Sequence, residues 1–524
     1  MTGTAGLLRL ALRRDRVWLT TWVLVLLGVT YGSGKAMGSA FPTQSSLDAY
    51  ARSVGASPAV VAMAGPPLAL DTLAGVVVNK VSLTSIVGVV LVASLTVCRH
   101  TRAEEESGRT ELLLATAVGR RAPSLAALVV ALGAVVLVGA GSALALVGAD
   151  VPAGSAWLFG LSLAGLGAVF ASLTLVLAQV LSHPRGVLGA SLAVFGVAYV
   201  VRAAGDVGEN GLVWLSPVGW MQATHPLGVD ERWWPLAVPV VVAALLVALS
   251  WSLEARRDVG AGLLATRRGP ASGSRRLAGP VALALRQQRA ALFGWGGGLF
   301  LLAAASGSLT KQVGELARDN PTVSASLADA GNGSPADSFL ATMLLVQALL
   351  AAAFATTSAL RLRSEETSGR LEVLLATGLS RTRWLLGSLV VTAGGTVLLL
   401  LLQGAGLGLS YALVRSDPAQ LTRLTGLALV YAPAALAMGA LAVLLVGWLP
   451  RAVPVAWAAL SLCFVLGWFG GLLHPPYWLE SLSPFFQTPA VPVEKATLAP
   501  AAIAVVVVLL VVLGASGARR RDLG

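Results

Sequence analysis

The polar residues best placed to do chemistry belong to one pattern that the chain contains twice. EEESGRTELLLATAVGR runs from Glu104 to Arg120, and SEETSGRLEVLLATGLSR runs from Ser364 to Arg381. Carboxylates, hydroxyls and guanidinium groups at this spacing can make charge-assisted hydrogen bonds to another protein. We interpret these two stretches, called here the first and second repeated segments, as binding surfaces.

No set of residues in the chain supports catalysis. An ATPase phosphate loop has the form G-x-x-x-x-G-K-[ST]. The nearest string, YGSGKAMG at Tyr31, has Ala36 after Lys35 and misplaces the first glycine. Four histidines without an H-E-x-x-H motif give no basis for a metal site. We therefore expect that this chain is not an enzyme, and that any ATP chemistry comes from another chain.

The composition is that of a membrane protein. Of the 524 residues, 56% are hydrophobic and 12% are charged, whereas a soluble domain carries about 25% charged residues. Apolar runs of about 18 residues or more recur, and each can cross a hydrocarbon layer of about 30 Å as a helix. We predict an all-α polytopic membrane protein with about twelve transmembrane helices. The predicted spans are residues 17–36, 81–98, 124–148, 156–180, 187–204, 235–253, 291–310, 338–360, 384–413, 424–448, 453–473 and 497–516.

The distribution of positive charge predicts how the spans are oriented. Most Lys and Arg residues fall in alternate loops, on the side that also holds both termini. The positive-inside rule makes this side cytoplasmic. Both repeated segments lie on it. The net charge of +12 therefore indicates topology and contact with anionic lipid, and we expect no nucleic-acid partner.

The repeated segments are part of a duplication of the whole chain. Aligned on Ser107 and Ser368, they share E-E-x-S-G-R-x-E-[LV]-L-L-A-T. LALRRDRVWLTTW at Leu10 likewise matches LALRQQRAALFGW at Leu283. Each copy holds six spans, so the copies are parallel repeats related by an axis along the membrane normal. The predicted parts are a first six-span repeat at 1–262, a cytoplasmic linker at 263–282 and a second six-span repeat at 283–524.

Each repeated segment is expected to form a short amphipathic helix entered through its Ser-Gly break. The acidic pair stands near the expected helix start, where the helix dipole favours it, and arginine closes the segment. A solvated loop that only maintains topology explains a single copy equally well. Two copies favour a specific cytoplasmic partner that engages two equivalent sites.

The repeated segments resemble the cytoplasmic loop after the second span in ABC-2 type exporter permeases. In that loop an acidic, glycine-containing stretch precedes LLAT and a basic residue. The duplicated twelve-span layout is similar to the actinobacterial family called exporters of polyketide antibiotics, and the likeness covers nearly the whole chain. Many relatives have proline after LLAT, whereas Ala117 and Gly378 stand there in this chain.

This resemblance implies a permease subunit that exports a hydrophobic or amphipathic molecule, such as a polyketide-type antibiotic or drug. It implies a bacterial plasma (inner) membrane with both termini cytoplasmic. It also implies two copies of a separate ATP-binding subunit, which would hold ATP and Mg²⁺, so that this chain has no cofactor of its own. The docking role carries over to Glu104, Glu105, Ser107, Gly108, Arg109, Glu111, Glu365, Glu366, Ser368, Gly369, Arg370 and Glu372.

A proton-coupled secondary transporter of the major facilitator type is the alternative. It also has twelve spans in two parallel repeats, but its signature in the same loop is built on Gly and Asp-Arg. Proton coupling usually needs ionisable groups at membrane depth, and we expect none in the interiors of the predicted spans. The polar residues there are Gln347 and Gln403. They either line a transport pathway or hydrogen-bond a neighbouring helix, as such residues commonly do.

Overall fold

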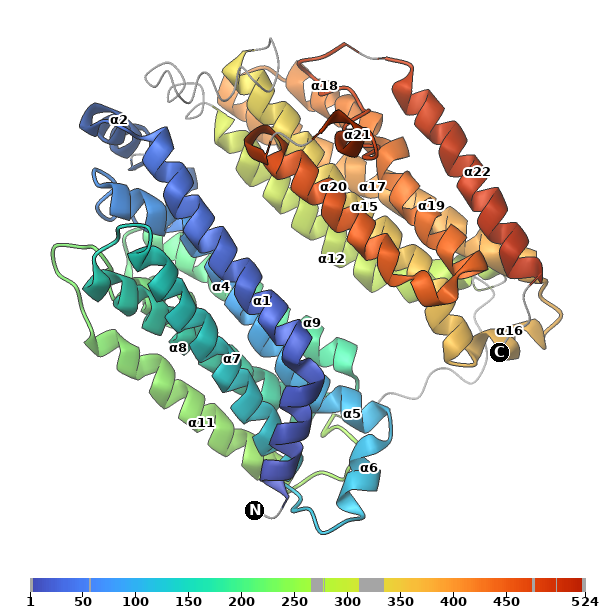
Figure 1. Ribbon diagram of the computed structural model, residues 1–524, viewed down its shortest axis with the longest axis horizontal. Helices are drawn as coiled ribbons and strands as arrows, with labels where there is room; N and C mark the ends of the chain where they lie inside the picture. Colours follow the sequence, from blue (N-terminus) through green and yellow to red (C-terminus); the bar gives the residue numbers. More distant parts are fainter. Residues whose placement is uncertain are drawn as a thin grey trace. The chain divides into compact units, whose positions relative to one another are not determined.

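The chain folds into helices arranged in two compact units. The computed structural model describes residues 3–55, 58–264, 277, 279–310, 334–473, 476–495 and 497–520. Within them every regular element is a helix. The units are Met1–Gly269 and Pro270–Gly524, and each is described by itself (Figure 1). Among the described residues, 12 helices are long and apolar enough to cross a membrane, which confirms the prediction of an all-α polytopic membrane protein.

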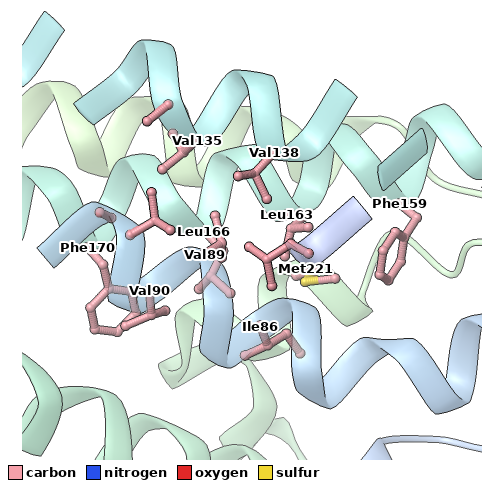
Figure 2. Close-up of a cluster of buried hydrophobic side chains, with 14 of the residues drawn as sticks. Ile86, Val89, Val90, Val135, Val138, Phe159, Leu163, Leu166, Phe170 and Met221 are labelled. Atoms are coloured by element: carbon pink, nitrogen blue, oxygen red, sulfur yellow. The ribbon is translucent and has the colours of Figure 1, made fainter. Parts of the chain in front are cut away.

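Unit 1 is built around three central helices whose sides are apolar nearly all round. Such helices must be buried on several faces, and Val89, Val135 and Leu163 in their shared core are fully buried (Figure 2). The central helices are α4 (Leu73–His100), α7 (Ala122–Val147) and α8 (Ala153–Val180). The more exposed spans around them are α1 (Thr4–Ala40), α9 (Pro184–Val207) and α11 (Ala237–Glu254).

Shorter elements connect the spans of unit 1. They are α2 (Gln44–Gly55), α3 (Pro58–Ala64), α5 (Arg102–Glu106), α6 (Arg109–Leu114), η1 (Gly211–Leu215), α10 (Pro217–Gln222) and η2 (Trp234–Leu236). Helices α5 and α6 lie in or beside the first repeated segment, and α2 and α3 lie in the long loop before α4.

Unit 2 repeats the order of spans seen in unit 1. Its core contains the buried side chains of Leu344, Phe354, Leu399 and Tyr431. The spans are α12 (Pro280–Ser308), α15 (Pro335–Thr367), α17 (Arg381–Arg415), α19 (Ala432–Trp448), α20 (Pro454–Leu473) and α22 (Ala499–Arg520). The shorter elements are α16 (Arg370–Leu375), α18 (Ala419–Ala428), η4 (Leu429–Tyr431), η5 (Pro450–Ala452) and α21 (Tyr477–Glu480).

Several predicted boundaries differ from the structure. Helix α1 begins at Thr4, because the basic N-terminal segment continues into the first span. Helix α15 runs on to Thr367, through the acidic pair of the second repeated segment. The span predicted at 424–448 is divided between α18 and α19, where η4 precedes Pro433 in the first turn of α19; proline is tolerated at that position because its missing N–H would have no partner there.

The predicted linker is only partly described. Helix α12 begins at Pro280, inside the stretch 263–282 assigned to the linker. Residues 265–276 and 278 of that stretch lie outside the described residues, as does most of the loop predicted at 311–337.

Close packing of α7 on α8 depends on two facing glycines. A Cβ atom on Gly139 would clash with the carbonyl oxygen of Gly160, and a Cβ on Gly160 would clash with that of Gly139. Small residues at such a crossing let the two backbones approach closely. This contact holds two of the three central helices of unit 1 together.

Replacing Gly139 by alanine should therefore destabilise unit 1. Overpacking of this kind costs about 1–3 kcal/mol, so Gly139→Ala should lower the unfolding temperature of the purified protein in detergent. Gly133→Ala on the same helix is the matched control, because a Cβ there meets nothing within 4 Å. Equal unfolding temperatures for the two variants would contradict the proposed contact.

Candidate functional site

Each repeated segment turns sharply at its glycine and then enters a short helix. Gly108 and Gly369 have φ values of 73° and 69°, a left-handed conformation that glycine adopts without steric cost. The preceding serines hold the turn, since Ser107 donates to the Glu104 carbonyl at 3.0 Å and Ser368 to the Glu365 carbonyl at 3.2 Å. The helices that follow, α6 and α16, confirm the predicted short helix after the Ser-Gly break.

Helices α6 and α16 present matching exposed side chains. Arg109 and Glu111 on α6 are exposed, and so are their counterparts Arg370 and Glu372 on α16. Directly after each glutamate stands an exposed apolar residue that the sequence analysis did not select. Leu112 is 73% exposed and Val373, at the matching position, is 69% exposed. An apolar side chain repeatedly left in solvent is typical of a surface that binds another protein.

The acidic residue Glu105 faces into unit 1 rather than into solvent. Its carboxylate accepts from Arg102 at 2.8 Å and from Arg257 at 2.5 and 3.0 Å. Arg257 also donates to the side-chain oxygen of Gln179 at 2.6 Å, and Arg102 donates to the carbonyl of Ala261 at 2.9 Å. Arg102, Glu105, Gln179 and Arg257, called here the Glu105 cluster, therefore join α5 to the end of α8 and to the chain beyond α11.

A second set of charges joins α5 to α1. Arg14 on α1 forms an ion pair with Glu104, and Arg109 lies 3.5 Å from the same carboxylate. Asp15 is fully buried and lies 2.6 Å from His100 and 3.1 Å from Arg99, at the end of α4. The N-terminal part of α1 is thereby fixed beside the first repeated segment.

Unit 2 keeps one contact of its acidic pair and replaces the other. Glu366 pairs with Arg363 at 3.0 Å, which matches the Arg102–Glu105 pair of unit 1. Glu365 is buried and accepts from the indole N–H of Trp384 at 3.2 Å. The pair lies in the last turn of α15, so its predicted place near a helix start is wrong for this unit. The helix dipole disfavours carboxylates at that end, and Arg363 and Trp384 compensate.

A small cavity occurs at the same place in both units. In unit 1 it measures about 30 Å³ and is lined by Glu105, Arg120 and Ser124. In unit 2 it measures about 40 Å³ and is lined by the counterparts Glu366, Arg381 and Leu385. Cavities of this size hold a water molecule or two and no larger ligand. We interpret these positions as joints between helices.

The two predicted pathway glutamines lie inside unit 2. Gln347 on α15 is 1% exposed and Gln403 on α17 is fully buried. Gln403 donates to the carbonyl of Leu344 on α15 at 3.4 Å, whereas both amide atoms of Gln347 have no hydrogen-bond partner among the described residues. In this state neither glutamine opens onto a described cavity.

One buried charge contradicts the expectation that the spans lack ionisable groups. Arg202 on α9 is fully buried. It pairs with Asp206 at 3.0 Å and donates to the carbonyl of Ala62, near the end of α3, at 2.9 Å. An arginine near the end of an apolar run looks like an interfacial residue, and its backbone acceptors on a distant loop leave no signal in the sequence.

Among the residues that the structure describes, no group of three or more His, Cys, Asp or Glu side chains is placed to hold a metal ion.

Comparison with known proteins identifies the family. A family model described as "Multidrug efflux system permease Rv1217c, C-terminal domain" matches residues 5–252 and 277–519. The chain belongs to this family. It is also 40% identical over 528 residues, covering 99% of this chain and 95% of the relative, to "Multidrug efflux system permease protein Rv1217c" of Mycobacterium tuberculosis (strain ATCC 25618 / H37Rv).

Family membership narrows the alternatives left by the sequence. It places the chain among multi-pass membrane permeases, as the apolar helices also do. The alternative of a major facilitator type transporter is not favoured. The names of the family and of its relative refer to multidrug efflux, without distinguishing the polyketide exporter branch.

Removing the bridging arginine of the Glu105 cluster should loosen the first repeated segment. Arg257→Gln leaves the Glu105 carboxylate with Arg102 alone, and a lost charged hydrogen bond costs about 1.5–3 kcal/mol. Amide hydrogen exchange at residues 102–116, followed by mass spectrometry, should become at least about tenfold faster.

The matched control is Arg109→Gln. The Arg109 side chain is 59% exposed and 3.5 Å from Glu104, and such surface pairs contribute about 0–1 kcal/mol. Exchange in this variant should stay close to that of the unaltered protein. Equal exchange in the two variants would show that the Glu105 cluster does not hold the segment.

Proposed function

We propose that this chain is the membrane-spanning permease subunit of an ATP-driven exporter of hydrophobic or amphipathic drugs. Its membership of a multidrug efflux permease family supports the drug-exporting role. The sequence contains no phosphate-binding loop, so ATP and Mg²⁺ would bind a separate subunit. Two copies of that subunit would engage the chain, one at each repeated segment.

The observation that carries this proposal is the matching surface of α6 and α16. Each helix exposes an apolar side chain, Leu112 or Val373, directly after an exposed glutamate and three residues after an exposed arginine. An exposed apolar centre with charged neighbours is the usual form of a protein-binding patch. Gly108 and Gly369 turn both helices away from the spans that precede them. The same surface built twice fits a partner that binds twice.

Within unit 1, buried charges would transmit a force on α6 to the spans. A movement of α6 would pass through α5 to Glu105, and from there to Arg257 beyond α11 and Gln179 at the end of α8. The Arg14–Glu104 ion pair would carry it to α1. Closure of two ATP-binding subunits would shift the permease between states only if docking is stronger in one of them.

In unit 2 the corresponding route would run through an aromatic contact. Glu365 at the end of α15 is hydrogen-bonded to Trp384 in the first turn of α17. A movement of α16 would therefore reach two of the central spans of unit 2. The transport pathway would then open and close by rearrangement of the apolar helices, with Gln347 and Gln403 as candidate polar contacts for cargo.

The proposed orientation places both repeated segments and both termini in the cytoplasm of a bacterial cell, with the spans in the plasma membrane. The positive charge on this side supports it. A polyketide-type antibiotic is the cargo class that the resemblance to polyketide exporters implies. Apolar central helices with few polar groups suit such a cargo.

Charging the apolar centre of both docking helices should abolish docking. Leu112→Asp together with Val373→Asp removes a central apolar contact at each site, a change that commonly costs about 2 kcal/mol or more. The permease would be co-expressed with an ATP-binding subunit from the same source and purified by a tag on the permease. We expect two ATP-binding subunits per unaltered permease, one in each single variant and none in the double variant.

Leu215→Asp is the matched control, because Leu215 is 72% exposed but lies far from α6 in the chain, in η1. Unfolding temperatures would establish that every variant is folded. Retention of both subunits by a folded double variant would rule out docking at these helices. If the unaltered permease binds no such subunit and moves drug along a proton gradient, the ATP-driven proposal is wrong.

A further inference from the structure

A small cavity lies in unit 1, beside the first half of α4, whereas the first repeated segment follows the other end of that helix. The cavity measures about 40 Å³ and is covered by the loop between α3 and α4 and by the chain that follows α10. Its polar lining includes Asn79, Ser82 and Gln222, and its apolar lining includes Ile86, Phe159 and Met221. Figure 2 shows the last three among the side chains of the unit 1 core. In its present form the cavity holds one small polar group.

Gln222 brings an unsatisfied acceptor to this cavity. Its side-chain oxygen is buried and has no hydrogen-bond partner among the described residues. A buried acceptor without a donor is costly, and native structures rarely keep one without a reason. Packing around it is tight, since a Cβ on Gly65 would clash with the side-chain nitrogen of Gln222. The amide of Gln222 therefore lies against the backbone of Gly65, while its side-chain oxygen has no donor.

The two segments that cover the cavity contain strained backbone. Ala69 in the first and Leu227 in the second have φ values of 49° and 69°, a region that residues other than glycine rarely adopt. Gly75 on α4 allows the close approach of the Ala69 carbonyl. Such strain concentrates at segments that change conformation in function.

Each covering segment is anchored to the helices by a charged side chain. The end of α3 is held by Arg202, which donates to the Ala62 carbonyl at 2.9 Å. The second segment is held by Glu231, whose carboxylate accepts from the backbone N–H of Leu227 at 3.1 Å and from Ser155 at the start of α8. Leu227 is therefore both anchored by Glu231 and part of the cavity lining.

We propose that this cavity is the closed form of a binding subsite for the exported molecule. It takes a neutral hydrogen-bond donor, a hydroxyl or an uncharged amine, against the Gln222 side-chain oxygen. The aromatic or aliphatic body of the molecule lies against Ile86, Phe159 and Met221 when the covering segments open. No charged side chain lines the cavity, so a neutral donor is favoured over an ion.

This assignment rests on the proposed export function, and α4 connects the two. Asn79, Ser82 and Ile86 lie in the first half of α4, and the same helix ends at His100 beside Asp15. A continuous helix transmits a displacement along its length. Movement at the repeated segment would therefore reach the floor of the cavity.

The test measures binding to the permease alone, in lipid nanodiscs. The probes are 1-aminoanthracene, which has an N–H donor, and its N,N-dimethyl analogue, which has none. Fluorescence titration should show that the unaltered protein binds the amine about tenfold more tightly than the analogue, as expected for one buried hydrogen bond. Gln222→Leu should abolish this preference. Gln420→Leu should retain it, because Gln420 lies in α18 of unit 2 and its amide N–H donates to Asp417 instead.

Gln222→Leu should also raise the unfolding temperature of the unliganded protein, because it removes an unsatisfied buried acceptor; this readout separates loss of the subsite from loss of the fold. No binding of either probe, no preference for the amine in the unaltered protein, or an undiminished preference in Gln222→Leu would overturn the assignment. No ATP-binding subunit is present in this titration. Failure of the docking experiment and failure of the subsite are therefore distinguishable.

Discussion

The bilayer offers no water to the polar groups of a helix, and the rest of this structure depends on that constraint. Hydroxyl groups within the spans donate back to carbonyls of their own helix, as Thr30 does to Leu26 and Thr96 to Val92. Charged groups are placed near helix ends and paired there. The polar contacts are consequently few, and each fixes one helix against a particular neighbour.

Pairing of this kind decides which parts of unit 1 move together. Separating Glu105 from Arg257 would leave a poorly solvated carboxylate with Arg102 alone, which is more costly than breaking a surface ion pair. Helix α5, the end of α8 and the chain beyond α11 are thus joined more firmly than their apolar contacts alone require. Asp15 does the same for α1 and α4. A displacement of α6 would therefore move these helices together.

The sequence was sufficient for the spans and for the repeated segments, because each is a local property. Long apolar runs must become helices in lipid, and the Ser-Gly break announces the turns at Gly108 and Gly369. The sequence did not predict which side chains point into the unit and which point into solvent. Glu105 and Arg257 are far apart in the chain, and no periodicity brings them together.

The sequence also did not predict which individual charged residues are buried and which apolar residues are exposed. Arg202 donates to backbone carbonyls near the end of α3, and backbone acceptors leave no trace in composition. The exposure of Leu112 and Val373 leaves no signal in the sequence either, because apolar residues are usually buried. The resemblance to exporter permeases selected the segment correctly as a structural unit. It did not distinguish Glu105, which faces inward, from Glu111, which faces outward.

Divergence between the units shows which contacts the fold itself requires. Where unit 1 has Asp15 beside His100, unit 2 has Gln288, which accepts from Ser358. Where Ser124 donates to Glu254 in unit 1, Leu385 lines the corresponding cavity of unit 2. A hydrogen-bonded pair in unit 1 and an apolar side chain in unit 2 both pack at this position. The fold therefore requires only that a polar group placed there has a partner. Gln222 and Gln347 are among the described residues that have a buried side-chain atom without a hydrogen-bond partner. Apolar residues of similar size would pack at both positions without the cost of an unpaired amide, and in the proposed subsite the bound molecule would supply the partner that Gln222 lacks.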